Sequence, residues 1–404
     1  MNFFPASATS EARRLVLARS IRGFADGLVS VTLASYLDGL GYSGVQIGAI
    51  ITATMLGSAA LTLWIGLRQG RTNPRTILMI GTALMAFTGL GFAGFTAFWP
   101  LLIIGFAGTM NPSAADVSLF LPVEQSLLTE RVSARERTSL FARYTLGGAL
   151  AGALGALAAA LPGPISDALG QPLGDVQRSV FLLYALTSVA VLVLYLPLRI
   201  APRPAEAPRG LGESRGVVLR LAGLFSLDSF GGGFAVQSLL ALWLFKRFDL
   251  SVEAAGTVFF VAGVLSAGSQ LLSPILATRI GLVRTMVFTH LPANIFLIVA
   301  AFMPNAPLAI LFLLLRMALS QMDVPARQSY VMAVVPPEHR TAAASITNVP
   351  RSLAAALSPL LAGAMLSATS FGWPLVSGGG LKIVYDLLLL RQFGSLHPEE
   401  ETDI

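Results

Sequence analysis

Apolar residues run in long blocks along this chain, separated by short polar stretches. Most of the blocks reach roughly 20 residues, which is the length that a helix needs to cross the apolar core of a bilayer. Few of them carry a polar face at helical spacing, as a surface helix of a soluble protein would. We therefore expect twelve membrane-spanning helices, at about residues 15–38, 43–66, 76–97, 99–121, 138–160, 179–198, 217–244, 251–275, 283–303, 306–330, 342–366 and 374–392.

Composition supports a membrane location for these helices. Hydrophobic residues make up 54% of the chain and charged residues 12%, and the mean hydropathy is +0.73. A soluble protein carries about twice this charged fraction. The alternative, a large soluble all-α protein, would require polar faces that most of the blocks lack. The expected fold class is an all-α membrane protein, with the lipid bilayer as a partner.

Basic residues are concentrated in alternate loops. With the N-terminus inside, the outer loops hold only three of them, Arg178, Lys246 and Arg247. Because positive charge is retained on the cytoplasmic side, this asymmetry predicts a cytoplasmic (inner) membrane protein with both termini in the cytoplasm. It also accounts for the net charge of +6 without nucleic-acid binding. The chain contains no Cys, which excludes disulfides and thiolate metal sites, and we expect no cofactor.

A sequence motif occurs twice, 203 residues apart. Residues 122–138 contain Pro-Val-Glu-Gln-Ser, then a Val and an Arg-Thr pair, and residues 325–341 contain Pro-Ala-Arg-Gln-Ser with the same Val and Arg-Thr at the same spacing. A repeat half the chain long indicates two similar halves, and in so apolar a chain it is typical of a two-lobed transporter. We expect an N-terminal lobe over 1–198, a cytoplasmic linker over 199–216, and a C-terminal lobe with a short cytoplasmic tail over 217–404.

The loop after the second span resembles the signature loop of the major facilitator superfamily. Arg68, Gly70 and Arg71 match its Arg and Gly positions, while Leu67 stands where the family has Asp. The second half repeats part of this loop and resembles the family's usual exit from the tenth span, in Arg279, Gly281, Leu315, Arg316, Pro325 and residues 335–340.

The resemblance implies twelve helices in two pseudo-symmetric six-helix lobes, with spans 1, 4, 7 and 10 lining a central cavity. Most charged residues at bilayer depth fall on those four spans. An ionisable group at that depth is costly unless it faces water, protein or an opposite charge, so each is a candidate for function. These candidates are Asp26, Asp116, Asp228, Arg316 and Asp323, flanked by Arg22, Glu124 and Arg327, and the polar residues Thr109, Ser113 and Gln237 are further candidates for the cavity.

Three carboxylates are candidates for proton coupling: Asp116, Asp26 and Asp228. Asp116 ranks first because no cation lies within one helical turn of it, so that burial favours its protonated form. The alternative is that Asn111-Pro112 breaks the helix and leaves Asp116 as a cap of the next segment. Asp26 has Arg22 one turn away, and the alternative for it is a structural ion pair.

Spans 7 and 10 carry the remaining intramembrane charges. Asp228 stands close to the glycines 231–233, which indicate either a broken helix at a binding site or a close helix contact. Asp323 and Arg327 are one turn apart, and an internal pair is the favoured account of them. Arg316 lies two turns from Asp323, which makes it the better candidate for binding an anionic group of a substrate.

Glu124 and Arg327 occupy the same position in the two copies of the repeat. We hypothesise that they pair across the two lobes to close an inner gate in the outward-facing state. The alternative is that each is solvated or paired locally, with Arg131 or Asp323 as partners. The loop residues Arg68, Gly70 and Arg71 are further gate candidates, on the resemblance alone.

The function expected from these features is secondary active transport of a small solute by a monomer, with protons as the coupling ion. The chain has no phosphate-binding Gly-Lys-Ser/Thr loop, so an ion gradient rather than ATP is the expected energy source. Export ranks first, on glycines in span 5 that resemble an antiporter pattern, and proton-coupled uptake is the alternative. A membrane-embedded sensor or enzyme is the rival from another class. No enzymatic activity is expected, because the three His residues are scattered and His290 stands alone in span 9.

Overall fold

The computed structural model describes residues 4, 7–67, 73–113, 119–129, 131–133, 136–198, 212–336 and 339–394. Over these residues all regular structure is helical, which confirms the predicted all-α class. The α-helices are α1 Ser10–Gly39, α2 Gly44–Leu67, α3 Pro74–Gly94, α4 Phe98–Ala107, α5 Phe120–Thr129, α6 Arg137–Ala158, α7 Pro162–Leu169, α8 Leu173–Tyr195, α9 Arg215–Gly233, α10 Gln237–Phe248, α11 Val252–Ile280, α12 Leu282–Phe302, α13 Ala306–Leu319, α14 Asp323–Ala333, α15 Arg340–Ala368 and α16 Trp373–Phe393, and a short 3₁₀ turn spans Gly212–Ser214.

Ten helices or helix pairs in the described ranges are long and apolar enough to cross a bilayer. Two of the twelve predicted spans are missing from this set, the first and the fourth. Helix α1 carries several charged residues, which lower its hydropathy. The fourth span is described as two ten-residue helices, α4 and α5, on either side of residues 114–118, which lie outside the described ranges.

Several helices begin at capping residues that the sequence supplies. Side-chain oxygens of Thr9, Asn73, Ser251 and Asn305 each accept a hydrogen bond from a backbone N–H in the first turn of the helix that follows. These residue types are preferred at the N-cap because they satisfy donors that have no partner within the helix. The starts of α1, α3, α11 and α13 are therefore set locally.

Gly281 joins α11 to α12 with φ of +86°, in the left-handed region that favours glycine. It is the glycine of the second-half loop that resembles the family signature. Its backbone N–H donates to the carbonyl of Ala277 and closes the end of α11. The glycine therefore allows two long helices to follow each other with no longer loop.

Three predicted spans are broken into two helices each. Span 4 is divided into α4 and α5, span 7 into α9 and α10, and span 10 into α13 and α14. Glycines end α9, and Gly108 with Pro112 follows α4, as expected for residues that weaken or cannot continue a helix. Broken helices are tolerated at membrane depth only where protein or water satisfies the freed backbone groups.

Two of the breaks are satisfied by serine hydroxyls from other helices. Ser238 donates to the carbonyl of Pro112 at 2.9 Å, and Ser273 donates to the carbonyl of Met322 at 2.5 Å. The first contact joins the break in span 4 to α10, and the second joins the break in span 10 to α11. Packing against neighbouring helices therefore holds the irregular segments in place.

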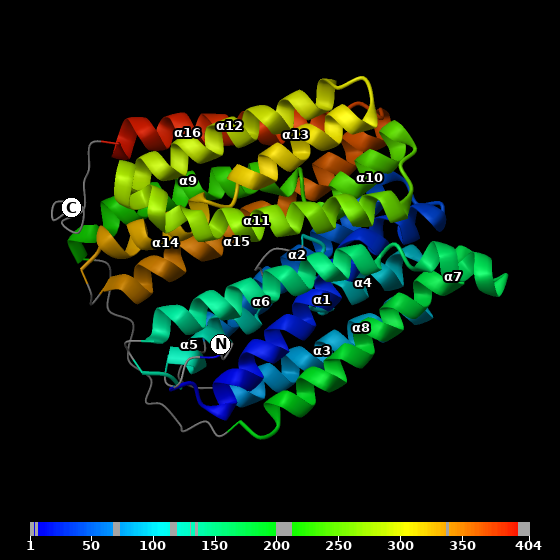
Figure 1. Ribbon diagram of the computed structural model, residues 1–404, viewed down its shortest axis with the longest axis horizontal. Helices are drawn as coiled ribbons and strands as arrows, with labels where there is room; N and C mark the ends of the chain where they lie inside the picture. The colour runs from blue at the N-terminus through cyan, green and yellow to red at the C-terminus, as the bar shows by residue number, and fades with distance from the viewer. Residues whose placement is uncertain are drawn as a thin grey trace.

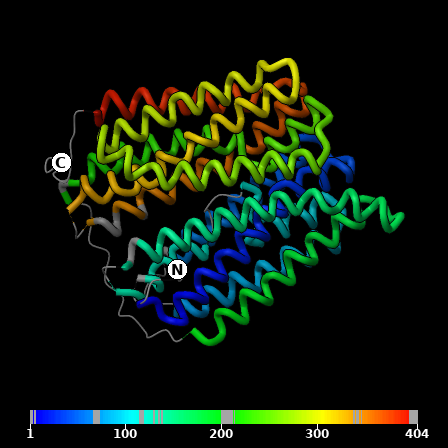
Figure 2. Tube along the Cα trace, in the orientation of Figure 1, coloured from blue at the N-terminus to red at the C-terminus, as the bar shows by residue number. Residues whose placement is uncertain are grey.

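The helices form two groups, α1–α8 and α9–α16, which Figure 1 shows one below the other. Within the first group α1 packs on α6 and α8, and α3 on α8. Within the second, α9 packs on α15 and α16, and α12 on α16. The tube drawing in Figure 2 shows the same separation along the Cα trace. The predicted lobe boundaries remain a prediction, because residues 199–211 of the linker lie outside the described ranges.

Contacts between the two groups run through α2 with α15, α6 with α11 and α1 with α10. Gly48 of α2 packs directly on the backbone of Pro359 in α15, and the backbone N–H of Val45 donates to the hydroxyl of Ser367 at 2.9 Å. These residues lie toward the ends of the helices that are remote from the chain termini. At the end near the termini α5 and α14 lie apart (Figure 1).

Candidate functional site

Glu124 on α5 is fully buried and is bound by side chains from three other helices. Arg22 of α1 forms an ion pair with it, and the hydroxyls of Tyr144 on α6 and Tyr195 on α8 donate to its two oxygens at 2.5 Å each. The guanidinium of Arg22 also lies 4.0 Å from the centre of the Phe120 ring. A buried charge is tolerated when it is paired and hydrogen-bonded in this way. This group, called the Glu124 cluster below, ties α5 to α1, α6 and α8.

Asp26 does not form the ion pair with Arg22 that was the alternative account of it. Arg22 points its charge at Glu124, and Asp26 makes no hydrogen bond or salt bridge within the described part of the chain. Its residue is 9% exposed, in the middle of α1, and it remains within electrostatic range of Arg19 and Arg22. Asp26 is therefore a carboxylate at bilayer depth that is shielded by cations and bound by none of them.

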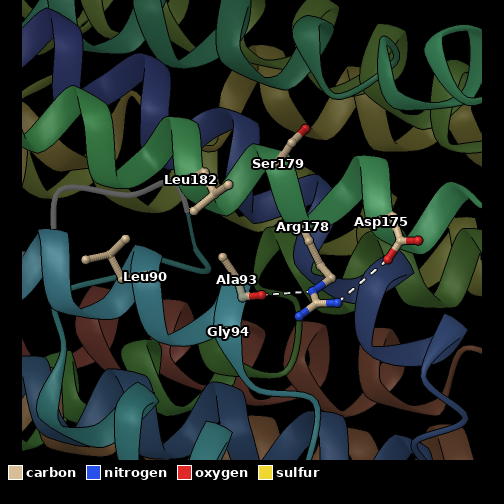
Figure 3. A pocket seen from close by; sticks show the side chains of 7 residues that line it. All are labelled: Leu90, Ala93, Gly94, Asp175, Arg178, Ser179 and Leu182. Carbon is tan, nitrogen blue, oxygen red and sulfur yellow. Dashed lines mark hydrogen bonds and ion pairs between the residues drawn. The ribbon is translucent and has the colours of Figure 1, made fainter. Parts of the chain in front are cut away.

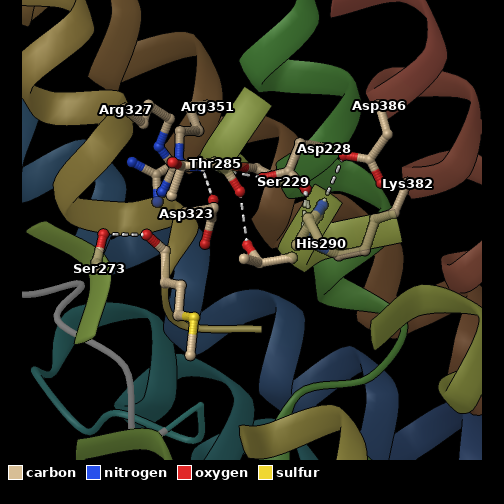
Figure 4. Close-up of polar contacts among 12 residues, drawn as sticks. Asp228, Ser229, Ser273, Thr285, His290, Asp323, Arg327, Arg351, Lys382 and Asp386 are labelled. Carbon is tan, nitrogen blue, oxygen red and sulfur yellow. Dashed lines mark hydrogen bonds and ion pairs between the residues drawn. The ribbon is translucent and has the colours of Figure 1, made fainter. Parts of the chain in front are cut away.

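Asp228 on α9 has the corresponding role in the second group of helices (Figure 4). Lys382 of α16 donates to one of its oxygens at 2.6 Å, and Arg327 of α14 lies 3.2 Å from the other. Arg327 also lies 3.2 Å from Asp323, one turn earlier in α14. The internal pair that was favoured for Asp323 and Arg327 is thus present, and it extends to Asp228.

His290 on α12 joins this network to a second carboxylate. Its Nδ1 lies 2.9 Å from Asp386 on α16, and its Nε2 lies 3.7 Å from Asp228 and 3.4 Å from the Lys382 ammonium. The amide of Asn294 donates to Asp386 at 3.0 Å. We call Asp228, His290, Asp323, Arg327, Lys382 and Asp386 the Asp228 cluster. No cluster of three or more His, Cys, Asp or Glu residues suited to a metal ion occurs among the residues that the structure describes.

Two arginines near the Asp228 cluster have no carboxylate partner in the described ranges. Arg316 on α13 reaches only the sulfur of Met317, at 3.0 Å, and its buried Nε has no hydrogen-bond partner there. Arg351 on α15 donates to the hydroxyl of Ser229 at 2.9 Å and to Asn348 at 3.3 Å. Such guanidinium groups are suited to binding an anion, because their planar donors match carboxylate and phosphate oxygens.

A pocket of about 340 Å³ lies elsewhere, between α3 and α8 (Figure 3). Arg178 crosses it, donating to the carbonyl of Ala93 at 2.8 Å and lying 3.7 Å from Asp175. Leu90 and Leu182 on its walls are 57% and 45% exposed, so the pocket opens on the apolar outer surface. It contains none of the residues of the two clusters.

The family model described as the Major Facilitator Superfamily matches residues 15–359 and 229–403. These matches cover nearly the whole chain. The chain belongs to the major facilitator superfamily. It is accordingly a multi-pass integral membrane protein with the fold of the superfamily's transporters.

Individual relatives and solved structures agree with this family. The chain is 26% identical over 426 residues to the uncharacterized membrane protein YJR124C of Saccharomyces cerevisiae, covering 96% of this chain and 94% of that protein. Its fold is similar to that of a D-xylose–proton symporter, with a TM-score of 0.78 at 17% identity, covering 96% of this chain and 99% of that one. It is also similar to an inward-facing bacterial homolog of the human lysosomal transporter Spinster, with a TM-score of 0.72 at 17% identity, covering 95% of this chain and 96% of that one.

Some of the predicted site residues of this superfamily member lie outside the described residues. They are the proton-coupling candidate Asp116 and the gate candidates Arg68, Gly70 and Arg71.

Three polar cavity candidates are described. The buried hydroxyl of Thr109 has no hydrogen-bond partner in the described chain, while Ser113 donates to the side chain of Asn111 at 2.7 Å in the irregular segment that follows α4. Gln237 donates to the hydroxyl of Ser30 at 2.9 Å, and so bridges the two groups of helices instead of extending into open space.

Glu124 and Arg327 do not pair with each other in this structure. Each pairs inside its own group of helices, Glu124 with Arg22 and Arg327 with Asp228. In both groups the pair joins the first cavity-lining span to the second, with the signs of the charges exchanged. The repeat carries Glu124 in one copy and Arg327 in the other because each residue pairs with an opposite charge inside its own half. The predicted pairing of Glu124 with Arg327 in an outward-facing state remains a prediction.

Sequence reasoning missed several residues of these clusters. Lys382 and Asp386 lie in the last span, four residues apart, and Arg351 lies in span 11, so all three were detectable as charges at bilayer depth. They were not predicted because the family resemblance implies a cavity lined by spans 1, 4, 7 and 10. Tyr144 and Tyr195 gave no signal, since buried tyrosines are common in apolar helices.

Proposed function

We propose that this chain is a secondary active transporter that moves a small organic anion together with a proton by alternating access. The observation that supports this proposal is the pair of buried charge clusters, one in each group of helices. Beside the Asp228 cluster lie Arg316 and Arg351, which have no carboxylate partner among the described residues. Charges at bilayer depth are costly and mark substrate and proton pathways in transporters. Membership of a superfamily of transporters makes a substrate pathway the first account of them.

Binding of an anion is supported by Arg316 and Arg351. Arg316 has no salt bridge in the described part of the chain, and its hydrogen bond to the Met317 sulfur is a weak one. An uncompensated guanidinium at this depth becomes more stable when an anionic group binds it. The negative charge of the bound anion would also favour binding of a proton to a nearby side chain. Binding of the solute therefore strengthens binding of the proton, and the reverse.

Cotransport replaces export as the favoured mode. Export was expected from the glycines of span 5, but some of these glycines pack on α1 where a side chain would not fit. A Cβ on Gly155 would collide with the carbonyl oxygen of Phe24, and a Cβ on Gly148 would collide with the side chain of Arg19. Close helix packing accounts for them without an antiporter function. The charge arrangement then favours uptake, the alternative mode, because solute and proton bind together.

The proposed membrane is the cytoplasmic membrane, with both termini inside. In that orientation the contacts of Val45 with Ser367 and of Ser30 with Ser238 lie on the outer side. The separated ends of α5 and α14 lie on the cytoplasmic side (Figure 1). The arrangement then corresponds to an inward-facing state, which is also the state of the Spinster homolog with a similar fold.

Purified protein in liposomes that contain a pH indicator tests this proposal. Gluconate, succinate and phenyl phosphate serve as anionic probes, with glucose and choline as neutral and cationic comparators. We expect at least one anion to acidify the interior when added outside, and Arg316→Gln to reduce that rate at least tenfold, since it removes the unpaired cation. Arg178→Gln, in the remote outer pocket, is the matched control and should transport normally.

Three results would contradict the proposal. Proton entry with choline alone would indicate a cationic substrate, and anion entry without proton entry would indicate an uncoupled carrier. Chemical conversion of a probe inside the liposomes would instead support the enzyme alternative.

A further inference from the structure

His290 is held between two carboxylates that belong to other helices, Asp386 of α16 and Asp228 of α9 (Figure 4). We propose that its imidazole loads and releases the coupled proton, and that its protonation decides whether Asp228 is bound by Lys382 or by the ring. This inference rests on the proposed proton-coupled transport and deepens it, because it assigns the proton to a residue outside the four cavity-lining spans.

Hydrogen bonding identifies the nitrogen that changes. Nδ1 lies 2.9 Å from Oδ1 of Asp386 and 3.1 Å from the amide nitrogen of Asn294, and this amide also donates to the other oxygen of Asp386 at 3.0 Å. An ionised carboxylate can only accept, so we assign a hydrogen to Nδ1 in both forms of the ring, and the Asn294 amide then donates to Asp386. The proton is therefore gained and lost at Nε2.

The surroundings of Nε2 favour two alternative arrangements. When Nε2 is unprotonated, its lone pair accepts from the Lys382 ammonium at 3.4 Å, while that ammonium also donates to Asp228 at 2.6 Å. When a proton from water binds Nε2, the ring presents N–H toward Oδ1 of Asp228, which lies 3.7 Å away, and repels the ammonium. His290 and Lys382 then compete for one oxygen. Loss of the same N–H proton to water restores the first arrangement.

The charge balance of the Asp228 cluster gives the ring a reason to bind a proton. Apart from the ring, its salt bridges involve three carboxylates and two basic groups: Asp228, Asp323, Asp386, Lys382 and Arg327. With a neutral ring the cluster therefore has a net charge of −1, and a proton on His290 cancels it. Because the side chains of His290 and Asp386 are only 4% and 0% exposed, water screens this imbalance poorly.

Charged groups reach the cluster from α13, α14 and α16, which pack against α12, and also from α9 and α15. These groups, with the phenol of Tyr385, are Asp228, Arg316, Asp323, Arg327, Arg351, Lys382 and Asp386. Helix α11 also touches α12, with its charges at its two ends, Glu253 and Arg279. Arg316 and Arg351 oppose the proton until an anion neutralises them, which couples the two binding events.

The cluster is placed where a change in its bonds acts on two broken spans. Asp228 lies within two turns of the end of α9, and Arg327 lies in the first turns of α14, each next to a break. Loss of the Lys382 bond to Asp228 would release α9 from α16 at this point, while the bond from Arg327 would still hold α9 to α14. A proton on His290 can therefore favour one arrangement of these helices over another.

Titration of the ring can be measured without knowing the solute. The chain contains three His residues, so His339→Gln with His397→Gln leaves His290 as the single reporter for ¹⁵N NMR of histidine-labelled protein in detergent. We expect Nε2, and not Nδ1, to gain and lose the proton when the pH of the sample is changed. In this background Asp386→Asn should allow the hydrogen of the neutral ring to move from Nδ1 to Nε2, because an amide can donate to Nδ1 as well as accept from it.

Tyr385→Phe is the matched control, because it removes an adjacent hydroxyl that has no hydrogen-bond partner in the described chain and changes no charge. It should leave the hydrogen of the neutral ring on Nδ1. A ring that keeps one protonation state at every pH tested, or that keeps this hydrogen on Nδ1 in Asp386→Asn, overturns the assignment.

Transport in liposomes provides the second test, with whichever anionic probe carries protons in the wild type. We expect His290→Gln to reduce accumulation of the probe under a pH gradient at least tenfold. The variant should still exchange labelled for unlabelled probe, because exchange requires no net proton movement. If the wild type carries no proton with any probe, the proposed function fails together with this inference. If the wild type is coupled and His290→Gln remains coupled, this inference alone fails.

Discussion

At the scale of single residues, each group of helices is held around one buried carboxylate. Glu124 accepts bonds from three helices, and Asp228 is approached by side chains of three helices. Removing one partner from such a group leaves an uncompensated charge or donor in a buried site, which is far more costly than the net value of the bond. These two carboxylates should therefore be sensitive to substitution of any partner.

Tyr195→Phe tests this for the Glu124 cluster. The hydroxyl of Tyr195 donates to the carboxylate at 2.5 Å, so its removal should destabilise the protein by about 1.5–3 kcal/mol, as expected for a hydrogen bond to a charged group. Tyr385→Phe is the control, since its buried hydroxyl has no hydrogen-bond partner in the described residues, and this variant should be at least as stable as the wild type. Thermal unfolding in detergent measures both. Equal losses in the two variants would contradict the account.

The sequence could predict which residues carry charge into the membrane, but not how those charges pair. Helical spacing placed Arg22 next to Asp26, and the structure pairs Arg22 with Glu124, which lies 102 residues away. Spacing reveals only neighbours on one helix. Pairing between helices depends on which helix faces pack together. In a mostly apolar sequence the residues on different faces are similar, so the sequence does not identify these contacts.

At the scale of helices, the repeat and the long apolar blocks were sufficient to predict the elements, and glycines and prolines indicated two of the breaks. Gly231–Gly233 ends α9, and Asn111-Pro112 lies in the irregular segment after α4. The break before α14 was not predicted, because Ser320 and its neighbours give no comparable signal. Here the hydroxyl of Ser273 on α11 binds the freed carbonyl, a contact that no local pattern reveals.

Glycine contacts between α1 and α6 permit a prediction about how these helices pack. A Cβ on Gly27 would collide with the carbonyl oxygen of Gly152, so Gly27→Ala should destabilise the protein by about 1–3 kcal/mol by forcing α1 away from α6. The matched control is Gly223→Ala in α9, where a Cβ meets nothing within 4 Å and should stabilise the helix by about 1 kcal/mol. Unfolding temperatures in detergent distinguish the two. A neutral Gly27→Ala would show that this contact can relax.

At the scale of the whole molecule, the two groups of helices meet at one end and lie apart at the other. The end contacts are made by small residues and hydroxyls, such as Gly48 with the Pro359 backbone and Ser30 with Ser238. Buried apolar side chains from both groups, such as Leu37 of α1 and Leu239 of α10, belong to one hydrophobic cluster beside these contacts. The buried charge clusters lie within the groups and not between them, which allows each group to move as a unit while its own ion pairs stay intact.

Paired cysteines test this movement directly, because the chain contains no Cys of its own. Val45→Cys with Ser367→Cys joins residues whose backbone and side chain are in hydrogen-bond contact, close enough for a disulfide after small adjustments. Ser126→Cys with Ser329→Cys is the matched pair, at equivalent positions of the repeat on α5 and α14, which lie apart (Figure 1). We expect the first pair to cross-link under mild oxidation and the second to stay reduced.

The locked protein should then lose transport in liposomes and regain it when a reductant opens the disulfide. This follows from alternating access, since a transporter that cannot open its contacts at the Val45 end has only one side available to the solute. The single variants Val45→Cys and Ser367→Cys control for the substitutions themselves and should transport with or without oxidant. A cross-linked double variant that still carries an anion across the membrane would show that these contacts do not have to open, and would exclude them as the outer gate.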